Sequence, residues 1–185
     1  TDSSDFGMEL KTFIEANYKK PFKFHTNLYA TFIKRCYEFT SEDGKIAMIH
    51  PDTFMFIKTF EDVRKFMIDK THIDILAQYP TSGIFRIGVI YPALYILSKP
   101  YNNRSDSLFI NLQDKRRNDA EERHELIKAL DDYIAGNDSE HNYPIPQSKL
   151  KIIKSWPFIY WISDEFREKF KLPACAEVAD IKSGL

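Results

Sequence analysis

Apolar residues recur along the chain at two different spacings. Spacings of three and four residues predict helices at residues 7–19, at residues 28–37 behind a cap at Thr26 or Asn27, and beyond a cap at Thr59. Short apolar runs predict strands at residues 45–50, 73–79, 89–97 and 107–112. Helices and strands therefore alternate over the first part of the sequence.

The later part is more polar. A charged helix is predicted at residues 119–134, with Leu126, Ile127 and Leu130 facing inward. A polar loop at 136–143 and a short capped helix at 163–170 follow.

The connections between the strands predict a mixed sheet. A helix that leads into a buried apolar strand, and does so repeatedly, favours a parallel α/β sheet. The runs 73–79 and 89–97 are too close for a crossover helix, so they should pair antiparallel. Pro92 lies inside the second run and indicates a bulge or an edge position. The pattern predicts an α/β fold whose parallel strands end in an antiparallel hairpin.

Composition changes this picture little. The chain has 185 residues, a formal net charge of −1 and 15% aromatic residues. A protein that holds DNA without sequence preference is usually basic, so DNA contact would need a local basic patch or further parts. The first residues are polar and acidic, and no apolar run approaches the roughly 20 residues that cross a bilayer, so we expect a cytoplasmic protein and no membrane partner.

Motifs for common chemistries are missing from the sequence. The two cysteines and five histidines show no CxxC or HxxxH spacing, so no metal site is expected. None of the six glycines forms a GxG turn that could cradle a phosphate or cofactor, and there is no GxSxG nucleophile motif. No two prolines are adjacent.

Several ordered segments resemble the amino-group DNA methyltransferases, and most of all the adenine methyltransferases of BREX phage-defence systems. The segments are NLYATFI at residues 27–33, GKIAMIHP at 44–51, GIFRIGVIYPALYILSK at 83–99, PFIYW at 157–161 and AEVADIKSGL at 176–185. Each is moderately specific, and their shared order carries the resemblance. The family's glycine-rich donor loop and its Asn-Pro-Pro-Tyr or Asp-Pro-Pro-Tyr motif, both of which precede the matched helix, have no counterpart here.

The resemblance implies that the chain is the second half of a methyltransferase catalytic domain. Residues 1–114 would be the C-terminal part of a Rossmann-like sheet, and residues 115–185 a mostly helical connector to a target-recognition domain outside this sequence. The parent enzyme would transfer a methyl group from S-adenosylmethionine to the N6 atom of adenine in DNA, for restriction-modification or phage defence. This chain alone is expected to be inactive and to bind no S-adenosylmethionine. Without its N-terminal half, its sheet edge is expected to self-associate.

The resemblance also suggests a pocket for a flipped adenine. Phe85 precedes the last apolar strand, as the family's stacking aromatic does, and could form one wall. Pro51, Asp52 and Phe54 follow the carboxyl end of a predicted strand, which is where ligands bind in open α/β sheets. A plain packing or loop role remains the alternative for each. His50 is a weaker candidate for a general base.

Two groups of basic residues could contact DNA phosphates. They are Lys115, Arg116 and Arg117, and then Lys149, Lys151 and Lys154. Acidic neighbours such as Asp119 and Glu121 favour the alternative that the first group begins a solvated helix.

Two other functions stay open. The chain could be a standalone α/β module that binds a partner and has no enzymatic activity. A third, weaker hypothesis is a metal-dependent nuclease that uses Asp74, Asp114 and Lys115.

Overall fold

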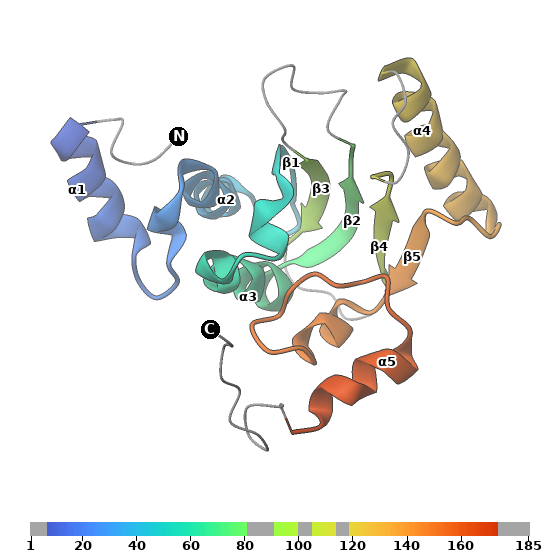
Figure 1. Cartoon of the computed structure of the whole chain (residues 1–185). Helices are drawn as coiled ribbons and strands as arrows, with labels where there is room; N and C mark the ends of the chain where they lie inside the picture. Colours follow the sequence, from blue (N-terminus) through green and yellow to red (C-terminus); the bar gives the residue numbers. More distant parts are fainter. Residues whose placement is uncertain (1–6, 81–90, 100–104, 114–118, 174–185) are drawn as a thin grey trace, which may run out of the picture.

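The computed structural model describes residues 7–80, 91–99, 105–113 and 119–173 (Figure 1). Two helices, α1 (Gly7–Tyr18) and α2 (Leu28–Phe39), come first, and Asn27 caps α2 by accepting a hydrogen bond from the Tyr29 N–H. The following elements are β1 (Lys45–Pro51), α3 (Glu61–Lys70), β2 (His72–Gln78), β3 (Pro92–Ser98), β4 (Ser107–Asn111), α4 (Asp119–Ala135), β5 (Asn142–Ile145) and α5 (Asp164–Glu168). Short 3-10 helices include η3 (Asp52–Met55) and η5 (Gln147–Lys151).

The strands form one mixed sheet in the order β1-β3-β2-β4-β5. β3 pairs antiparallel with both β1 and β2, β2 pairs parallel with β4, and β5 pairs antiparallel with β4. The predicted α/β class and the predicted antiparallel pairing of the second and third strands are confirmed. β5 was not predicted and lies partly within the expected polar loop.

Alternating side chains of the sheet enter two separate cores. On one face, Ile46, Leu76, Tyr95 and Phe109 pack with α2, α3 and the segment around Phe158. On the other face, the sheet packs against α4 through Leu126, Ala129 and Leu130. Ile127 was expected to face inward and is 46% exposed, because the inward face of α4 is the i, i+3, i+4 set of Leu126, Ala129 and Leu130. The sheet is thus covered by helices on both faces, as in α/β proteins.

β1 differs from the buried parallel strand that its apolar run suggested. It is an outer strand, and its only partner among the described strands is the antiparallel β3. Ile46 and His50 are buried, whereas Ala47 and Ile49 on the opposite face are exposed.

Pro92 belongs to β3, which has a strand on each side, so the predicted edge position is wrong. The alternative of a bulge is not found at Pro92 either, because the register shift between β2 and β3 lies at Ile73 and Ile75. It is the first residue of β3 and faces Pro51 at the end of the ladder, where neither residue has an N–H to donate. The cap expected at Thr59 is also wrong, because α3 begins after Phe60 without a side-chain cap.

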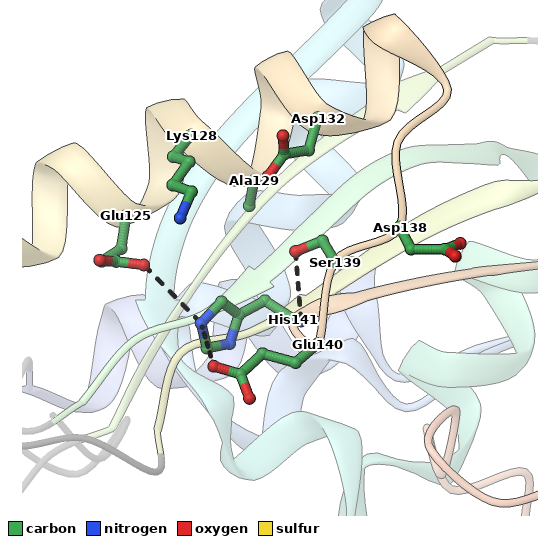
Figure 2. A pocket seen from close by; sticks show the side chains of 8 residues that line it. All are labelled: Glu125, Lys128, Ala129, Asp132, Asp138, Ser139, Glu140 and His141. Carbon is green, nitrogen blue, oxygen red and sulfur yellow. Dashed lines mark hydrogen bonds and ion pairs between the residues drawn. The ribbon is translucent and has the colours of Figure 1, made fainter.

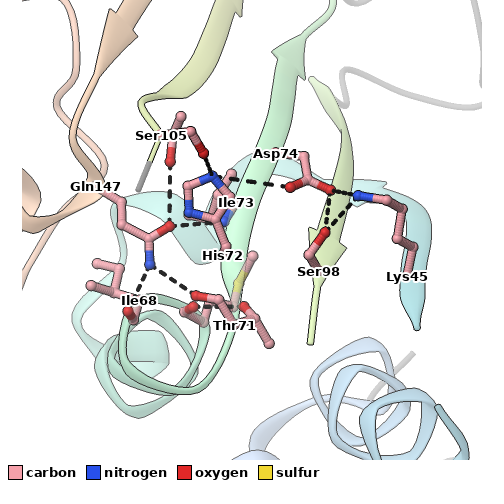
Figure 3. A network of polar contacts seen from close by, with 11 residues as sticks. Lys45, Ile68, Thr71, His72, Ile73, Asp74, Ser98, Ser105 and Gln147 are labelled. Carbon is pink, nitrogen blue, oxygen red and sulfur yellow. Dashed lines mark hydrogen bonds and ion pairs between the residues drawn. The ribbon is translucent and has the colours of Figure 1, made fainter. Parts of the chain in front are cut away.

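A buried glutamine fastens η5 to the start of β2 (Figure 3). Gln147 is 2% exposed, and its Nε2 donates to the carbonyls of Ile68 (2.7 Å) and Thr71 (2.9 Å). Its Oε1 accepts from the N–H of Ile73 at 2.8 Å and from the Ser107 hydroxyl at 3.3 Å. One side chain therefore provides hydrogen-bond partners for the backbone groups of the turn between α3 and β2, from a segment about eighty residues away in sequence.

Residues on both sides of position 114 share the larger core, since Leu150, Phe158 and Tyr160 belong to it. The division of a parent protein at that position stays a prediction. Within the described part of the chain, no helix combines the length and the apolarity that a membrane span requires.

Candidate functional site

Three strands end at the same edge of the sheet. β1 and β2 both run opposite to β3, and β4 runs parallel to β2, so the carboxyl ends of β1, β2 and β4 lie together (Figure 1). Asp52 follows β1, Gln78 ends β2, and Gln113 lies two residues beyond β4. This is the edge where open α/β sheets bind ligands.

Asp52 is the centre of a buried polar network at this edge. Its Oδ2 accepts hydrogen bonds from Gln78 Nε2 at 2.8 Å and from Gln113 Nε2 at 3.0 Å. Gln78 Oε1 in turn accepts a hydrogen bond from the hydroxyl of Tyr160 at 2.6 Å. Asp52 is 9% exposed, and Gln78 and Tyr160 are 1% exposed each.

The carboxylate of Asp52 experiences two opposing influences. Burial raises its pKa above the ordinary value, and the hydrogen bonds from Gln78 and Gln113 lower it. Burial is the larger effect, because it removes water from the charged form. The network therefore holds an acceptor group in a nearly dry environment, where a hydrogen bond to a ligand is strong.

The other candidates around η3 lie in different environments. Pro51 is partly exposed, whereas Phe54 is completely buried and contacts the rings of His50, Tyr95 and Phe158. Phe54 is therefore a residue of the aromatic core beneath Asp52. Phe85 lies outside the described residues.

His50 is placed as a structural side chain. Its Nδ1 bonds to the carbonyl of Pro51 at 3.1 Å, which makes this nitrogen the donor, and its Nε2 is 2.7 Å from the Tyr95 hydroxyl. Burial lowers its pKa to about 4, so the ring is neutral at pH 7. It stacks on Tyr29 with ring centroids 4.6 Å apart.

Tyr160 reaches the site from a segment without regular structure, residues 155–162, which we call the strap. Arg64 of α3 is completely buried and donates to the Ser155 carbonyl through Nε (3.1 Å) and Nη2 (2.8 Å). Arg167 of α5 is 1% exposed and donates to the carbonyls of Ile159 and Ile162. Two buried guanidinium groups therefore fix the strap at both ends.

The lysines predicted to contact DNA phosphates lie in different surroundings. Lys149 pairs with Asp164 and Lys151 with Asp69, each at 2.6 Å, whereas Lys154 is exposed. Lys115, Arg116 and Arg117 lie outside the described residues. The first two lysines are thus already engaged with carboxylates on the surface.

A hollow with a volume of about 320 Å³ lies between α4 and the segment before β5 (Figure 2). Its lining is rich in carboxylates, including Glu125, Asp132, Asp138 and Glu140. His141 lies between two of them, with Nε2 3.8 Å from Glu125 and 3.6 Å from Glu140. This hollow is unsuited to a DNA phosphate, because like charges repel.

No group of three or more metal-binding side chains occurs within residues 7–80, 91–99, 105–113 and 119–173. Asp74, named for the nuclease hypothesis, bonds to Lys45 and Ser98 at the opposite edge of the sheet (Figure 3). Its suggested partners Asp114 and Lys115 lie outside the described residues.

One family model and several solved structures are similar to this chain. A family model described as Eco57I restriction-modification methylase matches residues 2–85. The fold is similar to a type I restriction-modification methyltransferase subunit from Streptococcus thermophilus, with a TM-score of 0.60, 21% identity, and coverage of 80% of this chain and 33% of that chain. A chain from a structural study of assembly and conformational transition in a type I restriction-modification system gives a TM-score of 0.59 and 13% identity, over 93% of this chain and 38% of that chain.

Both structures are less than 25% identical to this chain, so they show a similar fold. The chain spans only 33% to 38% of the length of these two solved structures. None of the curated proteins matches the sequence.

Sequence reasoning missed most of the residues at this edge of the sheet. It singled out Asp52 and did not consider Gln78 or Gln113, although all three obey the same rule of lying at or after the carboxyl end of a strand. Tyr160 was noticed only as part of a motif, since its contact with Gln78 spans 82 positions.

Proposed function

We propose that this chain is part of a restriction-modification DNA methyltransferase and forms one wall of the pocket that receives the target base. The observation that carries the proposal is the convergence of Asp52, Gln78 and Gln113 at the carboxyl edge of the sheet, in a chain whose first half matches a restriction-modification methylase model. The substrate would be adenine in DNA and the product N6-methyladenine. The resemblance to BREX enzymes makes phage defence the biological setting we favour.

S-adenosylmethionine would be the methyl donor of the parent enzyme, and we place its site outside this chain. The residues present do not fit a donor site, because the sequence has no GxG turn that could bring backbone N–H groups close to the donor. The contribution of this chain would be to bind and orient the base.

The outer edge of β1 is suited to pairing with a strand from another part of the enzyme. No described strand pairs with that edge, and the apolar side chains of Ala47 and Ile49 are exposed beside it. An unpaired, partly apolar edge strand is a template for another strand. We propose that the donor-binding half of the enzyme adds its strands there, and that residues 115–185 lead to the recognition domain.

The proposal is tested with the protein encoded by the whole reading frame that contains this chain. We expect that frame to encode a glycine-rich turn and a Pro-Pro-Tyr motif before Thr1, and the purified protein to convert adenine in DNA to N6-methyladenine, detected by nucleoside mass spectrometry. Methylation of cytosine would contradict the adenine assignment. No methylation, together with tight binding of a protein partner, would favour the binding-module alternative.

Phe85 provides a second test in the same enzyme. Loss of one base-stacking ring costs roughly 1–3 kcal/mol, so Phe85→Ala should lower kcat/KM for DNA by about 5- to 160-fold. Phe39→Ala, at a ring 72% exposed on α2, is the matched control and should leave the rate unchanged. Equal rates for both variants would remove Phe85 from the pocket.

A further inference from the structure

Two aromatic rings are exposed next to each other where the strap passes the end of η3. Phe56 directly follows η3 and is 38% exposed, and Trp161 of the strap is 43% exposed. Their ring centroids lie 6.0 Å apart in an edge-to-face arrangement, and we call these two residues the aromatic pair. Ile57, beside Phe56, is 48% exposed and extends the apolar surface. Because η3 begins at the carboxyl end of β1, this surface adjoins the carboxyl edge of the sheet.

The indole of Trp161 is held on a rigid support. The buried guanidinium of Arg167 donates to the carbonyl of Ile159 at 2.9 Å and to that of Ile162 at 3.4 Å, on either side of Trp161 in the chain. The ring of Tyr160, which is 1% exposed, contacts the indole at 5.1 Å. A side chain that is fixed before binding loses little conformational entropy when a ligand packs on it.

Two lysines lie on the backbone segments that meet beside the aromatic pair. Arg64 donates through Nη1 to the Ile57 carbonyl at 2.7 Å and through Nη2 to the Ser155 carbonyl at 2.8 Å, so one guanidinium holds the two segments side by side. Lys58 follows the first of these carbonyls and Lys154 precedes the second. Both lysines are exposed, and neither makes an ion pair with a residue that the structure describes.

Carboxylates of the neighbouring helices are already engaged. Glu61 at the start of α3 pairs with Lys65 at 2.7 Å, and Asp164 at the start of α5 pairs with Lys149 at 2.6 Å. Asp62 accepts a hydrogen bond from a backbone N–H at 3.1 Å. The surface therefore combines exposed aromatic rings with two positive charges that no described carboxylate pairs with. Nucleic acids are bound by this combination, because cations contact phosphates and ring faces stack on bases.

We propose that the aromatic pair, together with Lys58 and Lys154, forms a DNA-contact surface next to the proposed base pocket. The lysines contact phosphates, and the rings stack on nucleotides that lose a neighbour when the target base leaves the helix. This inference rests on the proposed function and deepens it, because it names the part of the chain along which the DNA lies.

The stacking role is tested by the binding of this chain, at low salt, to two fluorescein-labelled DNA duplexes, one fully paired and one with a mismatched adenine. An unpaired base leaves the helix at a lower cost, so wild type should bind the mismatched duplex more tightly. Trp161→Ala should weaken that binding about 5- to 160-fold, which is the effect of losing one base-stacking ring. Phe39→Ala removes a ring 72% exposed on α2 and should leave binding as in wild type.

The fluorescence of Trp161 reports the same contact directly. The sequence has two tryptophans, so Trp156→Phe leaves Trp161 as the only one. The mismatched duplex should quench the emission of this variant, whereas Trp161→Phe, which keeps only Trp156, should show little quenching. Either unquenched Trp161 emission or an unchanged affinity of Trp161→Ala would overturn the stacking role, as would a wild-type chain that binds neither duplex.

The two lysines are tested by the salt dependence of binding. Each phosphate contact on duplex DNA contributes about 0.9 to the slope of log K against log salt concentration, so changing Lys58 and Lys154 together to Gln should reduce the slope by about 1.8. Changing Lys70 and Lys128 together to Gln removes the same charge at exposed positions on α3 and α4 and is the matched control. Equal slopes for the two double variants would remove Lys58 and Lys154 from the surface.

The protein encoded by the whole reading frame separates this surface from the proposed function. Methylation of adenine with an affinity for DNA that Trp161→Ala does not change would overturn the surface and leave the proposed function intact. DNA binding through this surface by a protein that methylates no DNA would overturn the proposed function and leave the surface as a DNA-binding site.

Discussion

At the scale of residues, the site depends on side chains that are buried in a defined protonation state. Asp52 is kept as an acceptor by two amide donors, although burial raises its pKa. His50, two residues before it, is kept neutral, because burial lowers its pKa to about 4. The two groups respond to acid in opposite ways, so their effects on stability can be separated.

The depressed pKa of His50 predicts a loss of stability in acid. Between pH 6.5 and about 4 the unfolded chain binds a proton at this position and the folded chain does not, so the free energy of unfolding falls as the pH is lowered through that window. At pH 4 the loss should be about 2–3 kcal/mol relative to pH 7.

Urea unfolding at pH 7, 6, 5 and 4 gives the free energy of unfolding of wild type and of His50→Gln. The loss is measured as the change, from pH 7 to pH 4, in the difference between these two free energies. His124→Gln, at an exposed histidine of α4, is the matched control. A difference between wild type and His50→Gln that stays constant from pH 7 to pH 4 would contradict the assignment.

At the scale of elements, local patterns predicted most helices and strands, and tertiary contacts decided the rest. The spacing of apolar residues located α2 and β2, and Asn27 is the one of the two candidate caps, Thr26 and Asn27, that caps α2. β5 was missed because its four residues, including Pro144, have no strand pattern of their own and become a strand only by pairing with β4. The hydrogen bonds of Gln78 and Gln113 to Asp52, and of Tyr160 to Gln78, were equally hidden, since they depend on the strand order.

The contacts of Gln147 predict a large effect of its removal. Gln147→Ala would leave the N–H of Ile73 and the carbonyls of Ile68 and Thr71 buried without this partner, which should lower the free energy of unfolding by about 2–4 kcal/mol. Ser148→Ala changes the exposed neighbouring residue and should alter stability by less than about 0.5 kcal/mol. Chemical denaturation of both variants measures the difference, and equal stabilities would show that the network contributes little.

At the scale of the whole molecule, the sheet is asymmetric. Helices cover both faces near its centre, whereas β1 has an open edge among the described strands and an exposed outer face. An open strand edge tends to pair with another chain when its natural neighbour is absent.

We therefore expect the isolated chain to self-associate through β1, with a sedimentation coefficient that rises with concentration. Ile49→Lys places a charge on that strand and should suppress the association, because a charged side chain blocks edge-to-edge pairing. Ile134→Lys makes the same change at a residue 81% exposed on α4 and should leave association as in wild type. A wild-type chain that stays monomeric at all concentrations, or equal behaviour of the two variants, would contradict this prediction.

The antiparallel strand in the middle of the sheet also sets the size of the side chain that can serve at position 78. Because β3 lies between β1 and β2, the ends of those two strands are separated by two strand spacings, roughly 10 Å. A glutamine and an aspartate together bridge that gap, whereas an asparagine at position 78 would stop one methylene short of Asp52. The strand order thus sets the distance that the side chain at position 78 must span, and glutamine, the longer of the two amide side chains, spans it.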